Sequence, residues 1–499
     1  MRARPDSSQE AHEAPLLPHD HTQTSPNERS VRVRGHAIAF AAGAVSALLV
    51  ASVAVVAIHR AQAAAEIIPR LSSSGKSIRG DSADEFVAGG MVHMDGMLDV
   101  PEVTPMPVLD DKGFPVLDDV LPTGRPRARW GIVGPGRIAR DFTAAIVTMG
   151  STVHAVAAGA LPGSTERAAE FAKFYGIPHA YGSYEELAAD PDVDVVYIAT
   201  TNHLHYTCAA LMLRHGKHVL LEKPATISPA AFADLMALAK ARGLLLVTNF
   251  WTRWFPAMKW AENVIKSGKL GPVVHVAGDM AFQAVRASPG GDRFMRSDLG
   301  GGALLDMGCY LVQFATLFLA GDHSVAGPGH DGFNVKASGD VVDGIDMETA
   351  FVITNGPAAA AFGTSLNRAS DFTVKVYCTH GMVTLQTPAN CPTYASYHLF
   401  TDATGHNETP VPCCGQRLVA RWEFEKELPK TPAKFLPPAY PNGMGFVYSA
   451  SAVERCLYTP GCTELEEMPL AQQMLIVNIT AEVARQVGIF QDLGPGVIA

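Results

Sequence analysis

The chain has 499 residues, of which 47% are apolar and 18% are charged, and its formal net charge is −10. At ~150 residues per domain this length corresponds to about three domains. The apolar content excludes a wholly disordered chain, and the acidic balance excludes the basic patch of a nucleic-acid-binding protein, so we expect no nucleic-acid partner. The 8 cysteines lack CxxC spacing and predict neither a disulfide framework nor a metal site, although some would be able to pair in an oxidising compartment.

Residues 37–58 form an apolar run without a charged residue. At ~1.5 Å per residue such a run spans the ~30 Å hydrocarbon core of a bilayer, so we expect one transmembrane helix over 36–59. A cleaved signal peptide and a buried core helix are the alternatives, but the run is longer than the apolar region of a signal peptide. The excess of arginines before the run predicts a single-pass membrane protein with a cytoplasmic N-terminus and the rest of the chain luminal or extracellular. The arginines concerned are Arg29, Arg32 and Arg34 before the run and Arg60 after it.

The segments on either side of this run have the composition of non-globular chain. Residues 1–35 are rich in Ser, Pro, His and acidic residues and bury too little apolar surface to fold, so we expect a disordered tail. Residues 60–127 read as a flexible acidic, Pro-rich stalk in which the sequence PVLDD occurs at 107–111 and again at 115–119.

From Ala128 the sequence takes on the pattern of a nucleotide-binding fold. Residues 134–139 read GPGRIA, a GxGxxA fingerprint between an apolar strand and an amphipathic helix. Gly134 permits the tight turn, Gly136 lets the backbone approach a pyrophosphate, and the helix N-terminus favours the anion. The strands and helices that follow alternate, which predicts an α/β Rossmann domain with a doubly wound parallel sheet over 128–247. The predicted elements are strands 153–158, 193–199 and 218–221 and helices 164–175 and 204–215.

The end of the second predicted strand bears on cofactor choice. It reads Ala-Ala-Gly at 157–159 and lacks the carboxylate that binds the ribose 2′-OH in NAD enzymes. Ser164, Thr165 and Arg167 follow and are able to donate to a 2′-phosphate. This favours NADP over NAD, which stays open as the alternative, as does an ordinary exposed position for Arg167.

Glu222-Lys223-Pro224 directly follows the strand 218–221, where strand ends in an open α/β sheet face the ligand crevice. With the glycine motif, TTNHLH at 200–205 and GGALLDMGCY at 301–310, the chain from Ala128 to its C-terminus resembles the Gfo/Idh/MocA oxidoreductase family. Within that family it resembles the branch that oxidises dihydrodiols and D-xylose with NADP. Further stretches that carry this resemblance are RWGIV, AYGSYEEL, WTRWFP, GMVTL and NGMGFVYSA.

The resemblance implies three catalytic residues: Lys223, Tyr310, which stands where many members carry His, and Asp306 one helical turn before it. Oxidation of an alcohol needs a base for the hydroxyl proton while hydride leaves for the nicotinamide. A Tyr with pKa near 10 needs a neighbouring cation to become a phenolate, so we expect Lys223 to stabilise it. Taken singly, the lysine is also compatible with a surface position, the tyrosine with packing and the aspartate with a helix cap.

The resemblance also implies binding residues. The expected cofactor contacts are Gly134, Gly136, Arg137, Ile138, Arg167, Thr200, Asn202, His205, Glu222 and Lys223, and the expected substrate contacts are the aromatic residues Trp251, Phe282 and Tyr440. Two positions depart from the branch: Gly159 replaces an Arg that binds the 2′-phosphate, and Asn390 replaces a Trp of the cleft. Both departures leave the exact substrate and the choice of NADP open.

For 248–499 we expect an α+β domain with a mostly antiparallel open sheet, which binds substrate and which in the family forms a dimer surface. The function that fits best is a membrane-anchored NAD(P)-dependent oxidoreductase that transfers hydride between nicotinamide and a cyclic sugar or vicinal diol, and we expect a homodimer. The alternative is a non-catalytic Rossmann-fold binding or scaffolding protein.

Overall fold

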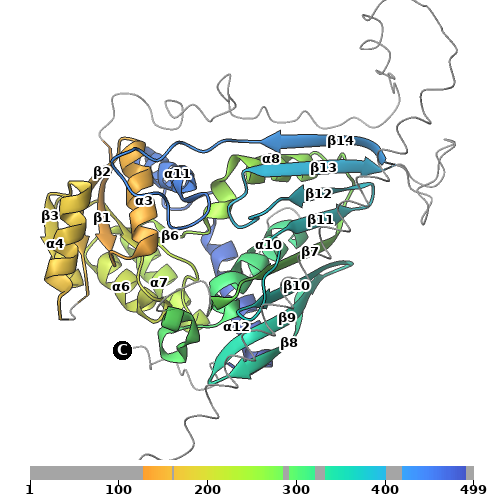
Figure 1. Ribbon diagram of the computed structural model, residues 1–499, viewed down its shortest axis with the longest axis horizontal. Coiled ribbons are helices and arrows are strands. Elements are labelled where there is room, and N and C mark those ends of the chain that lie inside the picture. Colours follow the sequence, from red (N-terminus) through yellow and green to blue (C-terminus); the bar gives the residue numbers. More distant parts are fainter. Residues whose placement is uncertain (1–126, 160–161, 285–290, 321–331, 401–417, 490–499) are drawn as a thin grey trace, which may run out of the picture. The chain divides into compact units, whose positions relative to one another are not determined.

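The computed structural model describes residues 127–159, 162–284, 291–320, 332–400 and 418–489 (Figure 1). The predicted tail, the predicted membrane helix and nearly the whole predicted stalk lie outside the described residues. Within these ranges the structure contains two sheets, each with its own helices.

The first sheet has six parallel strands in the order β3-β2-β1-β4-β5-β6, which is the doubly wound arrangement that the alternating pattern predicts. Its strands are β1 (Arg129–Val133), β2 (Thr152–Ala157), β3 (His179–Tyr181), β4 (Val195–Ile198), β5 (His218–Leu221) and β6 (Leu246–Thr248). Its helices are α3 (Arg137–Thr148), α4 (Ser164–Tyr175), α5 (Tyr184–Ala189), α6 (His205–Arg214) and α7 (Pro229–Arg242).

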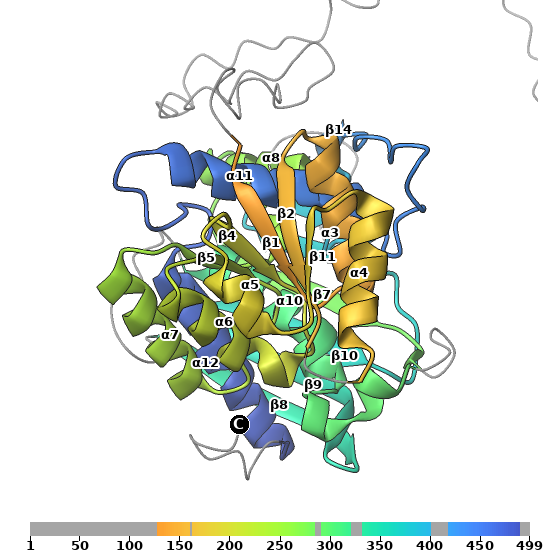
Figure 2. The same cartoon turned by 90° about the vertical axis from the view of Figure 1, so that its left-hand side faces the viewer.

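Helices cover both faces of this sheet (Figure 2). Successive side chains of a strand point to opposite faces, so Ile132 joins the core beneath α3 while Val133 joins the core beneath α6 and α7. Phe142 of α3 stacks on Tyr197 of β4, with ring centroids 3.8 Å apart. Burial on both faces explains why these strands read as continuous apolar runs.

The second sheet has eight strands in the order β14-β13-β12-β11-β7-β10-β9-β8, and all neighbours are antiparallel except β7 and β10. This agrees with the mostly antiparallel sheet predicted from the sequence. The strands are β7 (Val273–Ala281), β8 (Phe333–Val342), β9 (Ile345–Asn355), β10 (Ala358–Ser365), β11 (Val374–Cys378), β12 (Gly381–Leu385), β13 (Tyr394–Phe400) and β14 (Leu418–Glu425).

Helices α8 (Pro256–Lys266), α10 (Cys309–Leu319) and α12 (Leu470–Val487) pack against the second sheet, and α12 also packs on α7 of the first (Figure 1). Gln473 of α12 accepts hydrogen bonds from both the backbone N–H and the hydroxyl of Thr248, each at 2.8 Å. These bonds give the Thr248 backbone N–H, at the outer edge of β6, a hydrogen-bond partner. Helix α11 (Phe446–Tyr458) packs on α3, so both late helices of the chain contact the first sheet or its helices.

A disulfide joins Cys456 near the end of α11 to Cys462 in the following turn. The spacing of the cysteines did not predict this bond. The other cysteines of the described residues, Cys208, Cys309, Cys378 and Cys391, are free and buried.

Among the described residues, Ser297–Leu319 is the one helical stretch long and apolar enough to cross a membrane. It contains α10, and 94% of its most apolar window is buried inside the protein. Since it packs against β7 and β10, its apolar character is that of a core helix.

Candidate active site

The glycine loop lies between β1 and α3. Gly134 has φ +85°, and a Cβ added there would lie 3.0 Å from the carbonyl oxygen of Ala199, so only glycine fits. A Cβ at Gly136 would come no closer than 4.0 Å to any atom outside its immediate neighbours, so the backbone there is open to a ligand. Arg137, at the first turn of α3, is exposed, and Ile138 is half-buried. The loop therefore fits the pyrophosphate of a dinucleotide, with the N-terminus of α3 directed at it.

Lys223 follows β5 at the carboxyl end of the sheet, after which the Lys223–Pro224 peptide is cis. Its Nζ donates to the backbone carbonyl of Asp306 at 2.6 Å and lies 3.2 Å from the Asp306 carboxylate. Asp306 belongs to a π-helical turn, Leu304–Gly308, that leads into α10. The two residues lie 83 positions apart in the sequence, so the contact is made by the fold alone.

A third charged residue joins this pair. The guanidinium of Arg293 lies 3.3 Å from the same Asp306 oxygen, Oδ1. Arg293 belongs to a short 3-10 segment, Gly291–Met295. Nothing in the sequence predicted this arginine, because no motif or periodicity marks the segment that contains it.

Tyr310 lies one helical turn beyond Asp306, and the Lys223 ammonium lies 5.1 Å from the centroid of its ring. The ring also packs edge-on against Phe250. Burial, followed by the negative charge of Glu222, raises the pKa of the Tyr310 phenol well above its ordinary value. The Lys223 ammonium beside the ring does not offset burial and the neighbouring negative charges, so Tyr310 is a neutral phenol in this environment.

The ion pair itself keeps both partners charged. Burial lowers the pKa of Lys223, but the Asp306 carboxylate, together with Cys309 and Glu222, outweighs burial and leaves the pKa raised. Burial alone would raise the pKa of Asp306, and Lys223 with Arg293 reverses this so that its pKa is lowered. At neutral pH the site therefore contains an ammonium, a carboxylate and a neutral phenol.

Glu222 lies inside the protein and is bound by three donors. Its carboxylate accepts from the Tyr197 hydroxyl at 2.6 Å, from the Asn249 amide at 3.0 Å and from the backbone N–H of Lys223 at 3.3 Å. Burial raises its pKa. The carboxylate thus lies beneath the site and holds the end of β5 against β4.

The other residues expected around the cofactor also have partners within the protein. His205 Nδ1 lies 2.7 Å from the carbonyl of Pro224 and its Nε2 lies 3.3 Å from that of Thr200. Burial lowers the pKa of His205 to about 4, so its ring is neutral and donates only one of these bonds at a time. The Asn202 side chain donates to the carbonyl of Gly300 at 2.7 Å. These contacts link the strand ends to the segment before Asp306.

The three aromatic residues expected in the substrate cleft lie in different surroundings. Trp251 is buried and stacks on Phe446 with centroids 4.2 Å apart. Phe282, at the end of β7, is half-buried. Tyr440 is half-buried as well, and its backbone N–H donates to Asp141 of α3 at 2.9 Å. Only the last two therefore present surface to a ligand.

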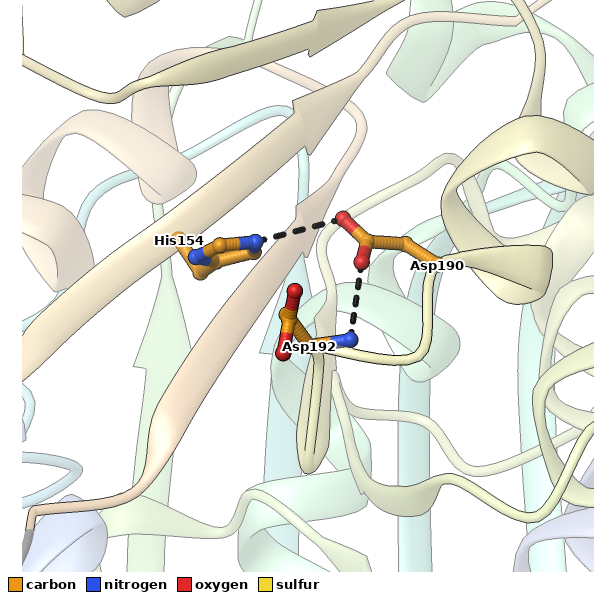
Figure 3. Close-up of side chains that lie close together, drawn as sticks. All are labelled: His154, Asp190 and Asp192. Atoms are coloured by element: carbon orange, nitrogen blue, oxygen red, sulfur yellow. Dashed lines mark hydrogen bonds and ion pairs between the residues drawn. The ribbon is translucent and has the colours of Figure 1, made fainter.

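Figure 3 shows a separate polar cluster, formed by His154 of β2 with Asp190 and Asp192, which precede β4. His154 Nε2 lies 3.4 Å from Asp190, which accepts from the Tyr181 hydroxyl and from the backbone N–H of Asp192. The Asp192 carboxylate pairs with Arg129 at 2.5 Å. Although His154, Asp190 and Asp192 are close enough to share a metal ion, these bonds account for both carboxylates, and the cluster serves to join strand ends.

Comparisons with known proteins agree with this geometry. Residues 128–250 match the model of an oxidoreductase family with an NAD-binding Rossmann fold, and residues 258–384 match the Gfo/Idh/MocA C-terminal domain. The trans-1,2-dihydrobenzene-1,2-diol dehydrogenase of Homo sapiens is 34% identical over 372 residues, covering 72% of this chain and 97% of the relative. That of Bos taurus is 34% identical over 367 residues, with the same coverage.

Solved structures share the fold at lower identity. A 3-ketoreductase from Actinomadura kijaniata, KijD10, in complex with NADP, is 22% identical with a TM-score of 0.55, covering 72% of this chain and 98% of its own. A levoglucosan dehydrogenase in complex with NADH and levoglucosan is 19% identical with a TM-score of 0.55, covering 72% of this chain and 97% of its own.

Proposed function

Because the chain belongs to the Gfo/Idh/MocA family of NAD(P)-dependent oxidoreductases, we propose that it is an NADP-linked dehydrogenase for a vicinal diol or cyclic sugar. The observation that carries this proposal is the grouping of Lys223, Asp306 and Tyr310 at the carboxyl end of β5. Residues 128–247 supply the cofactor site and 248–499 the substrate site. When bound, the nicotinamide supplies or accepts the hydride.

The residues of the chain then have to transfer one proton to or from the substrate and orient the substrate oxygen. Tyr310 is a neutral phenol, so it donates its proton to the oxygen of a carbonyl substrate during reduction and recovers it during oxidation. Lys223 uses two N–H groups on Asp306, which leaves its third for the same substrate oxygen. Asp306 holds the ammonium in place and favours its charged form, and Arg293 favours the ionised form of the Asp306 carboxylate.

The test measures both directions with the purified full-length protein: NADP reduction with dihydrodiols, pentoses and hexoses, and NADPH oxidation with the corresponding carbonyl compounds. Tyr310→Phe should lower kcat by about 10²- to 10⁴-fold, as expected for loss of a general acid. Tyr206→Phe, on the exposed side of α6, is the matched control. Absence of turnover with every substrate, together with intact cofactor binding, would favour the non-catalytic binding protein instead.

A second copy of this chain is the partner that we propose for the open face of the eight-stranded sheet. Helices α8, α10 and α12 pack against the sheet, yet Val274, Val342 and Val352 remain exposed. Sedimentation equilibrium should give twice the chain mass, and Val352→Lys should shift it towards the monomer, whereas Lys240→Glu on α7 should not.

We also propose that residues 37–58 anchor the chain in a membrane with the catalytic domain on the luminal side. The length of the apolar run and the arginines before it support this orientation, and the Cys456–Cys462 bond is of the kind that forms in oxidising compartments. Protease added to sealed vesicles should leave the catalytic domain intact. Digestion of the domain would show that it lies on the cytoplasmic side instead.

A further inference from the structure

Tyr440 lies on a segment that connects the second sheet to the helices of the first. Residues 426–445 run from the end of β14 to the start of α11, which packs on α3 (Figure 1). Phe435 of this segment packs on Tyr175 at the end of α4, with ring centroids 5.1 Å apart. The segment then contacts α3 through Ala439 and Tyr440. The position of Tyr440 therefore depends on the cofactor-binding half of the chain.

Asp141 of α3 accepts hydrogen bonds from two consecutive backbone N–H groups of this segment. Its Oδ1 accepts from Ala439 and its Oδ2 from Tyr440, each at 2.9 Å. The residue is only 3% exposed. A Cβ added at Gly443 would lie 2.7 Å from Oδ2, so glycine lets the segment close over the carboxylate. An amide in place of this carboxylate has one oxygen, so it keeps one of the two bonds and loses the other.

The turn after Tyr440 is held from the side of the second sheet. Asn442 has φ +57°, and its side chain donates to the carbonyl of Cys391 at 2.8 Å. The Cys391 thiol in turn donates to the carbonyl of Pro441 at 3.4 Å. Neither bond involves the N–H of Tyr440, which bonds to Asp141. Asp141 is thus the contact that joins Tyr440 to the cofactor helix.

The next residue of α3 supports a second aromatic residue expected in the cleft. Phe142 packs edge-on against Phe446, with centroids 5.7 Å apart, and Phe446 stacks on Trp251. Asp141 and Phe142 lie on the helix that begins directly after Gly136 of the glycine loop. One turn of this helix therefore contacts the supports of both Trp251 and Tyr440.

Tyr440 also lies near Tyr310. Burial, followed by the charge of Glu222, raises the pKa of Tyr197, and the phenols of Tyr310 and Tyr440 raise it further. Electrostatic effects of this kind fall off with distance, so both phenols lie near Tyr197. A displacement of Tyr440 therefore changes the surroundings of Tyr310.

We propose that Asp141 is a positioning residue for the substrate, which holds Tyr440 at the cleft and ties it to the helix whose N-terminus receives the pyrophosphate. The proposal rests on the proposed function and identifies how the cofactor-binding half shapes the substrate site. Asp141 acts through the backbone of Tyr440, because it is buried and both of its oxygens are already bonded.

Steady-state kinetics and calorimetric NADP binding by the purified full-length protein test the proposal. Asp141→Asn should raise KM for the cyclic sugar or diol about 10-fold, the range for loss of one charge-assisted bond, and leave kcat within about threefold. The Kd for NADP should stay within about twofold of the wild type. The matched control is Asp190→Asn, which alters another buried carboxylate that accepts from a backbone N–H, that of Asp192.

A double-mutant cycle separates positioning from a general structural role. Tyr440→Ala should itself raise KM, and Asp141→Asn added to it should change KM by less than about twofold, because no ring is left to position. Gly443→Ala places a Cβ against the same carboxylate from the other side of the contact and should also raise KM. This variant tests the contact even if Asp141→Asn does not fold.

An equal rise in KM with and without the Tyr440 ring would show a structural role and overturn the proposal. So would an unchanged KM or a parallel loss of NADP binding, and with wild-type turnover these results overturn this inference alone. If the wild type binds the sugar or diol without turnover, only the dehydrogenase function fails, and Kd for that compound replaces KM in the same cycle. A wild type that neither binds nor converts any of these compounds would overturn both.

Discussion

Lys223 donates from one ammonium group to both the backbone carbonyl and the carboxylate of Asp306, at 2.6 and 3.2 Å. The bond to the backbone carbonyl fixes the position of the ammonium relative to the π-helical turn. The negative charge of the carboxylate favours the protonated form of the lysine. A substitution of the aspartate therefore affects the charge while leaving part of the positioning intact.

Asp306→Asn should remove the negative charge that most opposes the effect of burial, so the pKa of Lys223 should fall. Since the protonated lysine is the active form, the alkaline limb of the pH–rate profile should move to lower pH, and kcat/KM at neutral pH should fall about 10- to 100-fold. The profile of Asp298→Asn, which removes an exposed ion pair with Arg296, should match the wild type. An unmoved limb in Asp306→Asn would contradict the role given to this pair.

Glu222→Gln should remove the negative charge that, after burial, most raises the pKa of Tyr310. The phenol would then lose its proton at lower pH, so carbonyl reduction should decline earlier on the alkaline side. The measurement is the pH dependence of NADPH oxidation, with the exposed Glu466→Gln as control. A reduction rate that declines at the same pH as in the wild type would exclude electrostatic coupling between the two residues.

Asp346 predicts a pH dependence of stability. Its Oδ2 accepts from the backbone N–H of Leu304 and from Thr349, each at 2.8 Å, whereas Oδ1 is buried without a described partner. Burial raises its pKa to about 6 from 3.8. Between these values the unfolded chain is deprotonated and the native chain is protonated, so stability should fall by about 3 kcal/mol as pH rises from about 4 to about 6.

Denaturant unfolding of the wild type and Asp346→Asn across this pH range checks the sign. The asparagine variant should lose most of the decline. Stability that rises through the window by the same amount in both proteins would show that Asp346 is ionised in the native state.

The Cys456–Cys462 bond closes a short turn, with a sequence separation of 6. Loop-closure entropy for so small a loop predicts that Cys456→Ser with Cys462→Ser lowers the free energy of unfolding by about 2 kcal/mol. Cys378→Ser, which replaces a free cysteine, is the control. Reduction and alkylation of the disulfide should still give the same increase in mass in this variant. Wild-type stability that does not change on reduction would contradict a structural role for the bond.

The spacing of apolar residues in the sequence predicted the fold. The details of the site depend on contacts between residues far apart in the sequence, which this spacing does not predict. Strands such as β1 and β4 are buried on both faces and read as apolar runs, so their parallel arrangement was predictable. His205 and Glu222 were predicted to contact the cofactor, and the structure shows in addition that His205 bonds to carbonyls beyond the ends of β4 and β5 and that Glu222 accepts from Tyr197 of β4. Only the fold determines which side of a strand end such a polar residue occupies.

The family resemblance implied the grouping of Asp306 and Tyr310 with Lys223, and the spacing of four residues placed Asp306 and Tyr310 one helical turn apart. The structure instead has a π-helical turn at this point, whose wider hydrogen bonding was not visible in the sequence. Arg293 was missed because its contact with Asp306 depends on the connection between β7 and α10, which has no periodic pattern.

Thr248 and Gln473 are 225 residues apart, and their bonds satisfy the edge of the cofactor-binding sheet. During synthesis β6 leaves the ribosome long before α12 is made, so the sheet waits with an unpaired edge until almost the whole chain has emerged. A nascent chain that stops before α12 therefore lacks the final side of its nucleotide-binding unit.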